Sequence, residues 1–331
     1  MYSNAEYAEL STLKRCHLLD EKEQTLHSLS DYKNTVQRMF TINPVLEQYS
    51  RSFALPAPGD WWSWYFVKKI VAEAKGNIHA KEWALIPEMG PFHIHLNFCE
   101  QVQDYYHFIF AEMYHQVFGK VLPKKPKCWK TEYCLHIMFL GWVMVREDIL
   151  EFFKDSKDHE VILLFYLLEE LLPIAFYFYT TVFRGGDFAL FANIIERLSL
   201  IMICFRRRHY DKAMLSWLSD RHHYTENFPE YISRKTSHLA IFTEKMVEIW
   251  HSILRRHISL TDDGKKIEHK AKTISANRFG RNISEDFLKA HNHPPSDKDL
   301  TAIANKVAEY LVDLFKRVAI NHGKSQFVSA N

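Results

Sequence analysis

The sequence predicts a mainly α-helical protein, with a large helical domain and a few short strands around residues 50–97. Three observations support this fold class. Hydrophobic residues make up 47% of the 331 positions, which is enough for a sizeable core. Only 10 glycines and 11 prolines are present, too few for a loop-rich or all-β protein. Apolar residues also recur at spacings of three and four through most of the chain after residue 130.

The helices can be placed in chain order from this periodicity. Residues 20–39 have an irregular apolar pattern, which predicts a weakly packed helix. A helix is expected over residues 61–74, and an aromatic helix is expected to end near Phe118. Further helices are expected at residues 131–153, 159–183, 187–218 and 237–257. Ser296 and Asp299 then resemble a capping box that opens a terminal helix.

Two proline-containing apolar segments are the best strand candidates. Residues 53–60 read FALPAPGD, a pattern typical of an extended segment that ends in a turn. Residues 83–91 form a second extended stretch that leads into residues 92–97. His93 and His95 would alternate there and point to one face. Such a pair could bind a transition metal, or the histidines could be buried and satisfied by backbone groups.

Changes in composition divide the chain into four predicted segments. Residues 1–45 are polar and mixed in charge, and residues 46–260 form the main helical domain with its short strands. Residues 261–295 are polar and basic, which is typical of a connector. Residues 296–331 form a C-terminal helix and tail.

Charge, cysteine content and the N-terminus argue against several classes of protein. The 42 lysines and arginines nearly balance 40 acidic residues, so no global field attracts nucleic acid or anionic lipid. The 5 cysteines are scattered and include no C-x-x-C pair, which argues against a disulfide framework or a thiolate zinc site. No basic start followed by an apolar run marks a secretory signal. We therefore expect an intracellular protein, nuclear or cytoplasmic.

The most apolar stretch, residues 161–183, is expected to form a buried pair of helices rather than a membrane span. Glu169, Glu170 and Pro173 lie at its centre. Each carboxylate there would cost about 2.5–3.5 kcal/mol in a bilayer. We therefore expect no membrane partner.

Two acidic residues are candidates for chemistry. Glu248 lies four residues after Glu244 on the helix predicted for residues 237–257, and such a pair of carboxylates needs a nearby cation. That cation could be a divalent metal, or the positive charge could come from Arg255, Arg256 and a basic neighbouring helix. Asp60 ends the first strand candidate, where it could bind a metal or cap the helix that follows.

A lysine-rich segment, KVLPKKPKCWK at residues 120–130, is predicted to be extended and stiffened by proline. Lys124, Lys125 and Lys127 could follow a row of phosphates while Trp129 stacks on a base. A solvated loop between helices would explain the same pattern.

A second basic cluster comprises Arg206, Arg207, Arg208 and Lys212, although at helical spacing its members point in different directions. The sequence contains no Walker loop, G-x-G-x-x-G, G-x-S-x-G or H-E-x-x-H motif. The sequence therefore lacks the motifs that usually indicate a kinase, a dinucleotide-binding enzyme, a serine hydrolase or a zincin.

Five short motifs between Leu55 and His257 carry a family resemblance. They are LPAPGDW at residues 55–61, IPEMGPFH at 86–93, LPKKPK at 122–127, LSD at 218–220 and VEIWHSILRR at 247–256. With these motifs the chain resembles a large uncharacterised family that is expanded in fungal genomes and looks transposase-derived.

This resemblance implies a degenerate RNase H-like core with a helical insertion. In intact transposases of this type, two Asp and one Glu hold two divalent metal ions that cleave a phosphodiester. Asp60 would correspond to the second Asp and Glu248 to the Glu, both as catalytic residues and metal ligands. The first Asp should end an upstream strand, but Asp20 and Asp31 lie in helix-like contexts.

With one ligand missing, we expect little or no nuclease activity, and Mg²⁺ would be the cofactor only of any activity that remains. The first hypothesis is therefore a catalytically impaired protein that binds DNA. Its phosphate contacts would come from Lys124, Lys125, Lys127, Arg255 and Arg256, with stacking by Trp129. The alternatives are a helical interaction or scaffold protein with no nucleic-acid role, and an intact metal-dependent nuclease.

Overall fold

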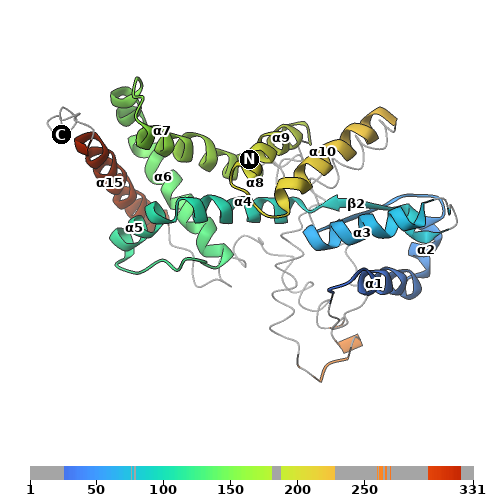
Figure 1. Cartoon of the computed structure of the whole chain (residues 1–331). Coiled ribbons are helices and arrows are strands. Elements are labelled where there is room, and N and C mark those ends of the chain that lie inside the picture. The colour runs from blue at the N-terminus through green and yellow to red at the C-terminus, as the bar shows by residue number, and fades with distance from the viewer. Residues whose placement is uncertain are drawn as a thin grey trace. The chain divides into compact units, whose positions relative to one another are not determined.

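The computed structural model is mainly helical, as predicted, and contains a two-stranded parallel sheet (Figure 1). It describes residues 26–75, 77, 80–180, 188–227 and 297–321, together with 259, 261–263, 265, 266 and 269. The elements used below are α1 (Leu29–Ile42), α2 (Pro44–Ser50), β1 (Leu55–Gly59), α3 (Trp61–Ala74), the 3-10 helix η3 (Lys81–Ala84), β2 (Leu85–Met89), α4 (Pro91–Tyr105), α5 (His107–Phe118), α6 (Cys128–Phe153), α7 (His159–Phe165), the π-helical segment η4 (Tyr166–Leu171), α8 (Leu172–Thr180), α9 (Phe188–Cys204), α10 (Tyr210–Asn227) and α15 (Asp297–Asn321).

The described residues form two compact units. Unit 1 contains those up to Ile94 and those between Thr180 and Asn292, whereas unit 2 contains the remainder. This division differs from the segments predicted from composition. Residues of the main domain expected at 46–260 are found in both units, and α15 of the expected C-terminal segment belongs to unit 2.

Unit 1 contains a β–α–β arrangement in which α3 and η3 connect the two strands. Strands β1 and β2 run parallel, in a register that pairs Leu55 with Leu85 and Gly59 with Met89. Both strands lie where the sequence predicted them. The extended stretch ends at Met89, however, because Pro91 opens α4 at a position where proline is favoured. Among the described residues no further strand joins this sheet, and an RNase H-like core stays a prediction.

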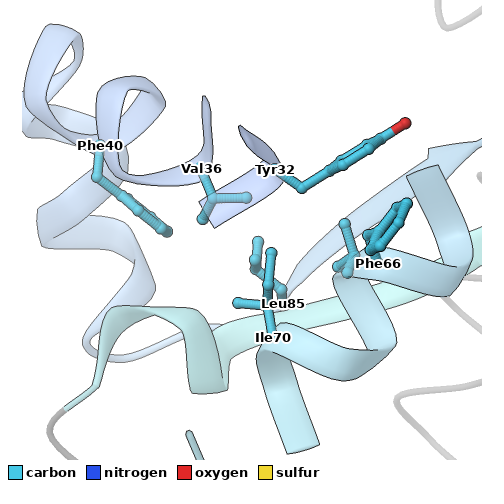
Figure 2. Close-up of a cluster of buried hydrophobic side chains, with 7 residues drawn as sticks. Tyr32, Val36, Phe40, Phe66, Ile70 and Leu85 are labelled. Carbon is cyan, nitrogen blue, oxygen red and sulfur yellow. The ribbon is translucent and has the colours of Figure 1, made fainter. Parts of the chain in front are cut away.

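Helix α1 packs against α3 and closes one side of the unit 1 core. Tyr32, Val36 and Phe40 recur every four residues and are all buried. Figure 2 shows them facing Phe66, Ile70 and Leu85. The Tyr32 and Phe66 rings stack with their centroids 4.6 Å apart. Weak packing was the wrong expectation for this helix, since three well-spaced apolar residues are enough to form a buried stripe.

Unit 2 is organised by the contact between α6 and α15. Gly141 of α6 lies directly against Val307 and Ala308 of α15. Phe315 of α15 is fully buried beside the ring of Trp142, with centroids 6.1 Å apart. The Tyr310 hydroxyl donates a hydrogen bond to the Ile109 carbonyl at 3.2 Å. The C-terminal helix is therefore part of a core rather than an appendage.

Over its described residues, His159 to Thr180, the apolar run forms one continuous helical stretch, α7–η4–α8, with a π-helical middle, rather than the expected pair of helices. Its carboxylate Glu169 accepts hydrogen bonds from Arg146 Nε and Nη2, each at 2.8 Å, and one from Trp142 Nε1 at 2.5 Å. Within the described part of the chain, His159–Phe178 is the one run long and apolar enough to cross a membrane, and half of its 18-residue window is buried. The burial and the ion pair both favour a place in a protein core.

The helix predicted over residues 187–218 is broken into α9 and α10. The break is a Schellman turn, in which Arg207 N donates to Met202 O at 2.9 Å and Arg206 N donates to Ile203 O at 3.0 Å. Arg206 occupies its left-handed position with φ of 51°, and His209 follows with φ of 77°. Neither position holds glycine or proline, so the sequence pattern did not reveal the turn.

Replacing Arg206 with glycine is expected to raise the free energy of unfolding of unit 1 by about 0.5–1 kcal/mol. Glycine relieves a left-handed strain of roughly 1–2 kcal/mol but adds freedom to the unfolded chain. Calorimetric unfolding of the full chain measures the effect. Arg208→Gly is the matched control, because Arg208 has a negative φ and the same change should only destabilise. Equal destabilisation by both variants would contradict the assignment of strain to Arg206.

Candidate functional site

Asp60 caps helix α3 in unit 1. Its Oδ1 accepts a hydrogen bond from Ser63 N at 2.9 Å, while its carbonyl accepts one from Trp64 N. The preceding Gly59 is required by space, since a Cβ there would lie 2.6 Å from Ser63 Cβ. The interpretation of Asp60 as a helix cap is thus confirmed, and this local role accounts for the Gly-Asp sequence without a metal.

The acidic triad implied by the family resemblance is not assembled by the described residues. Asp31 lies in the first turn of α1, where it accepts a hydrogen bond from Ser28 Oγ at 2.7 Å and forms a capping box. Asp20 and Glu248 lie outside the described residues. Where the structure describes the chain, no group of three or more His, Cys, Asp or Glu side chains could hold a metal ion. The pairing of Asp60 with Glu248 therefore stays a prediction.

The structure reveals a carboxyl group that sequence reasoning missed. Glu88 lies near the carboxyl end of β2, the edge where parallel sheets commonly carry functional groups. It accepts a hydrogen bond from Trp217 Nε1 of α10 at 3.1 Å. Removal from water, opposed by that hydrogen bond, raises the pKa of Glu88 to about 7. The available signal was a lone charge in the strand sequence Leu-Ile-Pro-Glu-Met.

A neighbouring ion pair shares the surroundings of Glu88. Lys68 Nζ of α3 lies 2.5 Å from Asp220 Oδ2 of α10 and 4.9 Å from the centre of the Trp64 ring. The Asp220 charge raises the pKa of Glu88, and the Lys68 charge lowers it. Lys68 thus provides a positive charge for the Asp220 and Glu88 carboxylates, a role that a metal ion could otherwise fill. A carboxyl group with a pKa near 7 can exchange a proton at neutral pH.

The suggested His93 and His95 metal pair is corrected by the structure. Both residues lie in α4, where a spacing of two places side chains on different faces rather than one. His95 is buried, with Nε2 2.9 Å from the Ala175 carbonyl, and its ring stacks on Phe178. The alternative of a buried histidine satisfied by a backbone group is confirmed for His95.

The lysine-rich segment forms a loop in unit 2, which we call the lysine loop and define as residues 119–127. Gly119 ends α5 in a left-handed conformation, with φ of 64°. Leu122 is buried and anchors the loop, while Val121 beside it is 84% exposed. Lys127 is the N-cap of α6 and makes no side-chain capping hydrogen bond. The loop is thus fixed at both ends and in the middle.

Lys124, Lys125 and Lys127 are all exposed on the lysine loop. None of their side chains forms a hydrogen bond or an ion pair with another described residue. The positive end of the α6 dipole lies at the same place and favours anions. Two acids partly offset this charge, because Glu100 and Glu132 lie near Cys128, where burial and then their negative charges raise the pKa of the thiol.

The other proposed nucleic-acid contacts are placed differently. Trp129 belongs to the first turn of α6 rather than to an extended strip, because the helix starts three residues earlier than predicted. The helical backbone at Trp129 therefore does not support the predicted extended strip in which Trp129 stacks on a base beside the lysines. Arg255 and Arg256 lie outside the described residues.

Comparisons with family models, with curated proteins and with solved structures found no match to this chain.

Proposed function

We propose that this chain is a nucleic-acid-binding protein of a transposase-derived family, impaired in catalysis, and that the lysine loop contacts DNA phosphates. The observation that carries the proposal is the set of three exposed lysines, Lys124, Lys125 and Lys127, which lack acidic partners among the described residues. Unpaired lysines on a fixed loop can neutralise phosphates without first breaking an ion pair.

The physical form of the loop supports this proposal. A loop anchored by Leu122 loses little conformational freedom on binding, so each contact costs less than it would on a mobile tail. The near-neutral net charge of +2 also means that DNA affinity must come from a local patch such as this one.

The proposed loss of catalysis is supported by the local role of two acids. The Asp60 carboxylate caps α3, and Asp31 lies in the first turn of α1, in a capping box with Ser28, rather than at the end of a strand. Residues 26–54, where an upstream strand would be expected, form helices and connections in the structure. Mg²⁺ would then serve only a residual activity, and an intact metal-dependent nuclease is the less supported alternative.

The proposal is tested by replacing Lys124, Lys125 and Lys127 together with glutamine. Binding of the full chain to a fluorescent duplex of about 20 base pairs is measured by anisotropy at several salt concentrations. The triple variant is expected to bind about 10- to 100-fold more weakly. The slope of log K against log salt should fall in magnitude by about one for each lysine.

The matched control replaces Lys154, Lys157 and Lys306 of unit 2 with glutamine. These lysines are also exposed, and the change in net charge is the same. Lys154 and Lys157 follow the far end of the 26-residue helix α6, about 39 Å from the loop along the helix axis. The control should retain wild-type affinity and slope. An equal loss in both variants would assign the effect to net charge, and the proposed site would be wrong.

A protein-interaction role is the second candidate function. Large apolar side chains are exposed on unit 2, including Val143 at 55%, Met144 at 51% and Tyr177 at 62%. Scattered exposed apolar residues are common on soluble proteins, so these support the role less strongly than the unpaired lysines support DNA binding. Binding to a partner through such residues should be insensitive to salt, in contrast to phosphate binding.

A further inference from the structure

An exposed tryptophan of unit 1 is surrounded by aromatic rings and positive charges. Trp62, in the first turn of α3, is 48% exposed. One stacking partner is Phe66, with ring centroids 5.9 Å apart. The imidazole of His209, from the turn between α9 and α10, lies 5.3 Å from Trp62 and stacks on Trp61 at 5.0 Å. The indole of Trp62 is therefore held in place by its neighbours and still open to solvent.

His209 is held in this position by an uncommon backbone conformation. Its φ of 77° is rare for a residue other than glycine, although histidine tolerates it better than most. Partial burial, and then the Arg208 charge, lower the pKa of His209 and so favour the neutral form of its ring. Residues held in such sparsely populated backbone conformations cluster at active sites and ligand-binding sites.

Positive charges flank the rings. Arg208 and Lys212 are exposed and close enough to His209 for their charges to lower its pKa, although Asp211 opposes them. Lys69 lies over the ring of Tyr65, 4.5 Å from its centroid, and Tyr65 stacks on Trp61. The exposed indole of Trp62, with cations beside the rings around it, fits a ligand that is flat, aromatic and negatively charged.

We infer that Trp62, His209, Arg208 and Lys212 form a binding surface for an unpaired base of single-stranded nucleic acid. The base stacks on Trp62, and the flanking phosphates contact Arg208 and Lys212. Stacking on tryptophan tolerates every base, so the surface distinguishes single strands from duplexes rather than one sequence from another. This inference goes beyond the proposed function because it concerns unit 1 and a different form of nucleic acid. It rests on the proposed function only in sharing nucleic acid as the partner.

The test measures binding of the full chain to three fluorescent DNA probes at one salt concentration. The probes are a 12-nucleotide single strand, an abasic strand of equal length and a duplex of the same sequence. Trp62→Ala should weaken binding to the single strand about 10-fold and leave duplex binding unchanged, since one stacked base is lost. The abasic strand should bind wild type and Trp62→Ala equally.

Trp83→Ala is the matched control, because Trp83 is 44% exposed in η3 and is not part of the surface. It should bind all probes like wild type. Since Trp62 also packs on Phe66, the double variant Arg208→Gln and Lys212→Gln tests the same surface without removing a packed ring. It should weaken single-strand binding about 10-fold and lower the salt slope by about two.

The outcomes separate this inference from the proposed function. If the lysine-loop variant binds duplex like wild type while Trp62→Ala loses single-strand binding, the proposed function fails and the inference stands. Equal single-strand affinity of wild type, Trp62→Ala and the double variant would overturn the inference, whatever the duplex result. Self-association of the wild type that Trp62→Ala abolishes, without any binding of the single strand, would assign the surface to a second copy of the chain and also overturn it.

Discussion

Replacing Gly141 with alanine is expected to lower the free energy of unfolding of unit 2 by up to about 2 kcal/mol, although alanine is the better helix former. A Cβ at this position would lie 2.6 Å from Val307 Cγ1, 2.8 Å from Val307 Cβ and 3.0 Å from Ala308 N. Two of these atoms cannot rotate away, so α6 and α15 must separate. Overpacking of this kind costs roughly 1–3 kcal/mol or more, whereas helix propensity returns about 1 kcal/mol.

Denaturant unfolding followed by circular dichroism measures this loss. Val143→Ala is the control, because Val143 lies two residues away on α6 and is 55% exposed, so its change should stay within about 0.5 kcal/mol. Adding Val307→Ala to Gly141→Ala should restore only part of the stability, since Val307 Cβ and the Ala308 backbone remain. A Gly141→Ala variant more stable than wild type would show that α6 and α15 do not pack as closely as described.

The pH dependence of stability in unit 1 is expected to be governed in part by Glu88. Its pKa rises from 4.5 to about 7 on folding, so the folded state holds a proton that the unfolded state releases. Stability from this group is therefore fully present below about pH 4.5 and is lost as the pH rises through 7. The loss corresponds to at most about 3 kcal/mol.

Glu88→Gln should remove this dependence. Glutamine keeps a carbonyl oxygen for the Trp217 Nε1 donor but carries no charge at any pH. The variant should therefore gain roughly 1–3 kcal/mol over wild type between pH 5 and pH 8. Trp217→Phe provides an independent check. Losing the donor to the carboxylate should raise the pKa of Glu88 further, so the decline in stability should start at the same pH but extend to higher pH and become larger. Parallel pH profiles of wild type and Glu88→Gln would contradict the environment described for this carboxyl group.

Local patterns predicted much of the secondary structure. Helix α3 was expected over residues 61–74 and has those bounds, because Asp60 caps it and the lysine at position 75 follows its last apolar turn. The two strands could be predicted because prolines lie among their apolar residues and disfavour a helix there. The start of α4 was missed for two reasons. The alternation of His93 and His95 was interpreted as a strand pattern, and Pro91 was not recognised as the first residue of a helix.

The break between α9 and α10 could not be predicted from local signals. Residues in the left-handed backbone conformation are usually glycine or asparagine, but here Arg206 and His209 have positive φ angles. Tertiary contacts of His209 with Trp61 and Trp62 supply the missing information. Those contacts join segments about 150 positions apart and leave no trace in a periodic pattern.

The candidate sites show the same limit. The lysine loop could be found from the sequence, since its lysines and prolines are contiguous. The surroundings of Glu88 could not, because Trp217 lies 129 positions away and Lys68 and Asp220 are separated by 152. Each residue alone has an ordinary interpretation, and only the packing of α10 against β2 and α3 brings them together.

The central claim is that the lysine loop binds the phosphates of DNA, and the salt dependence of duplex binding by the full-length wild-type chain tests it most directly. The account predicts measurable affinity at about 50 mM salt and a slope of log K against log salt of about −3 or steeper, equivalent to the release of counterions from at least three phosphates. A chain that shows no affinity at low salt, or an affinity that does not change between 50 and 200 mM, would contradict it.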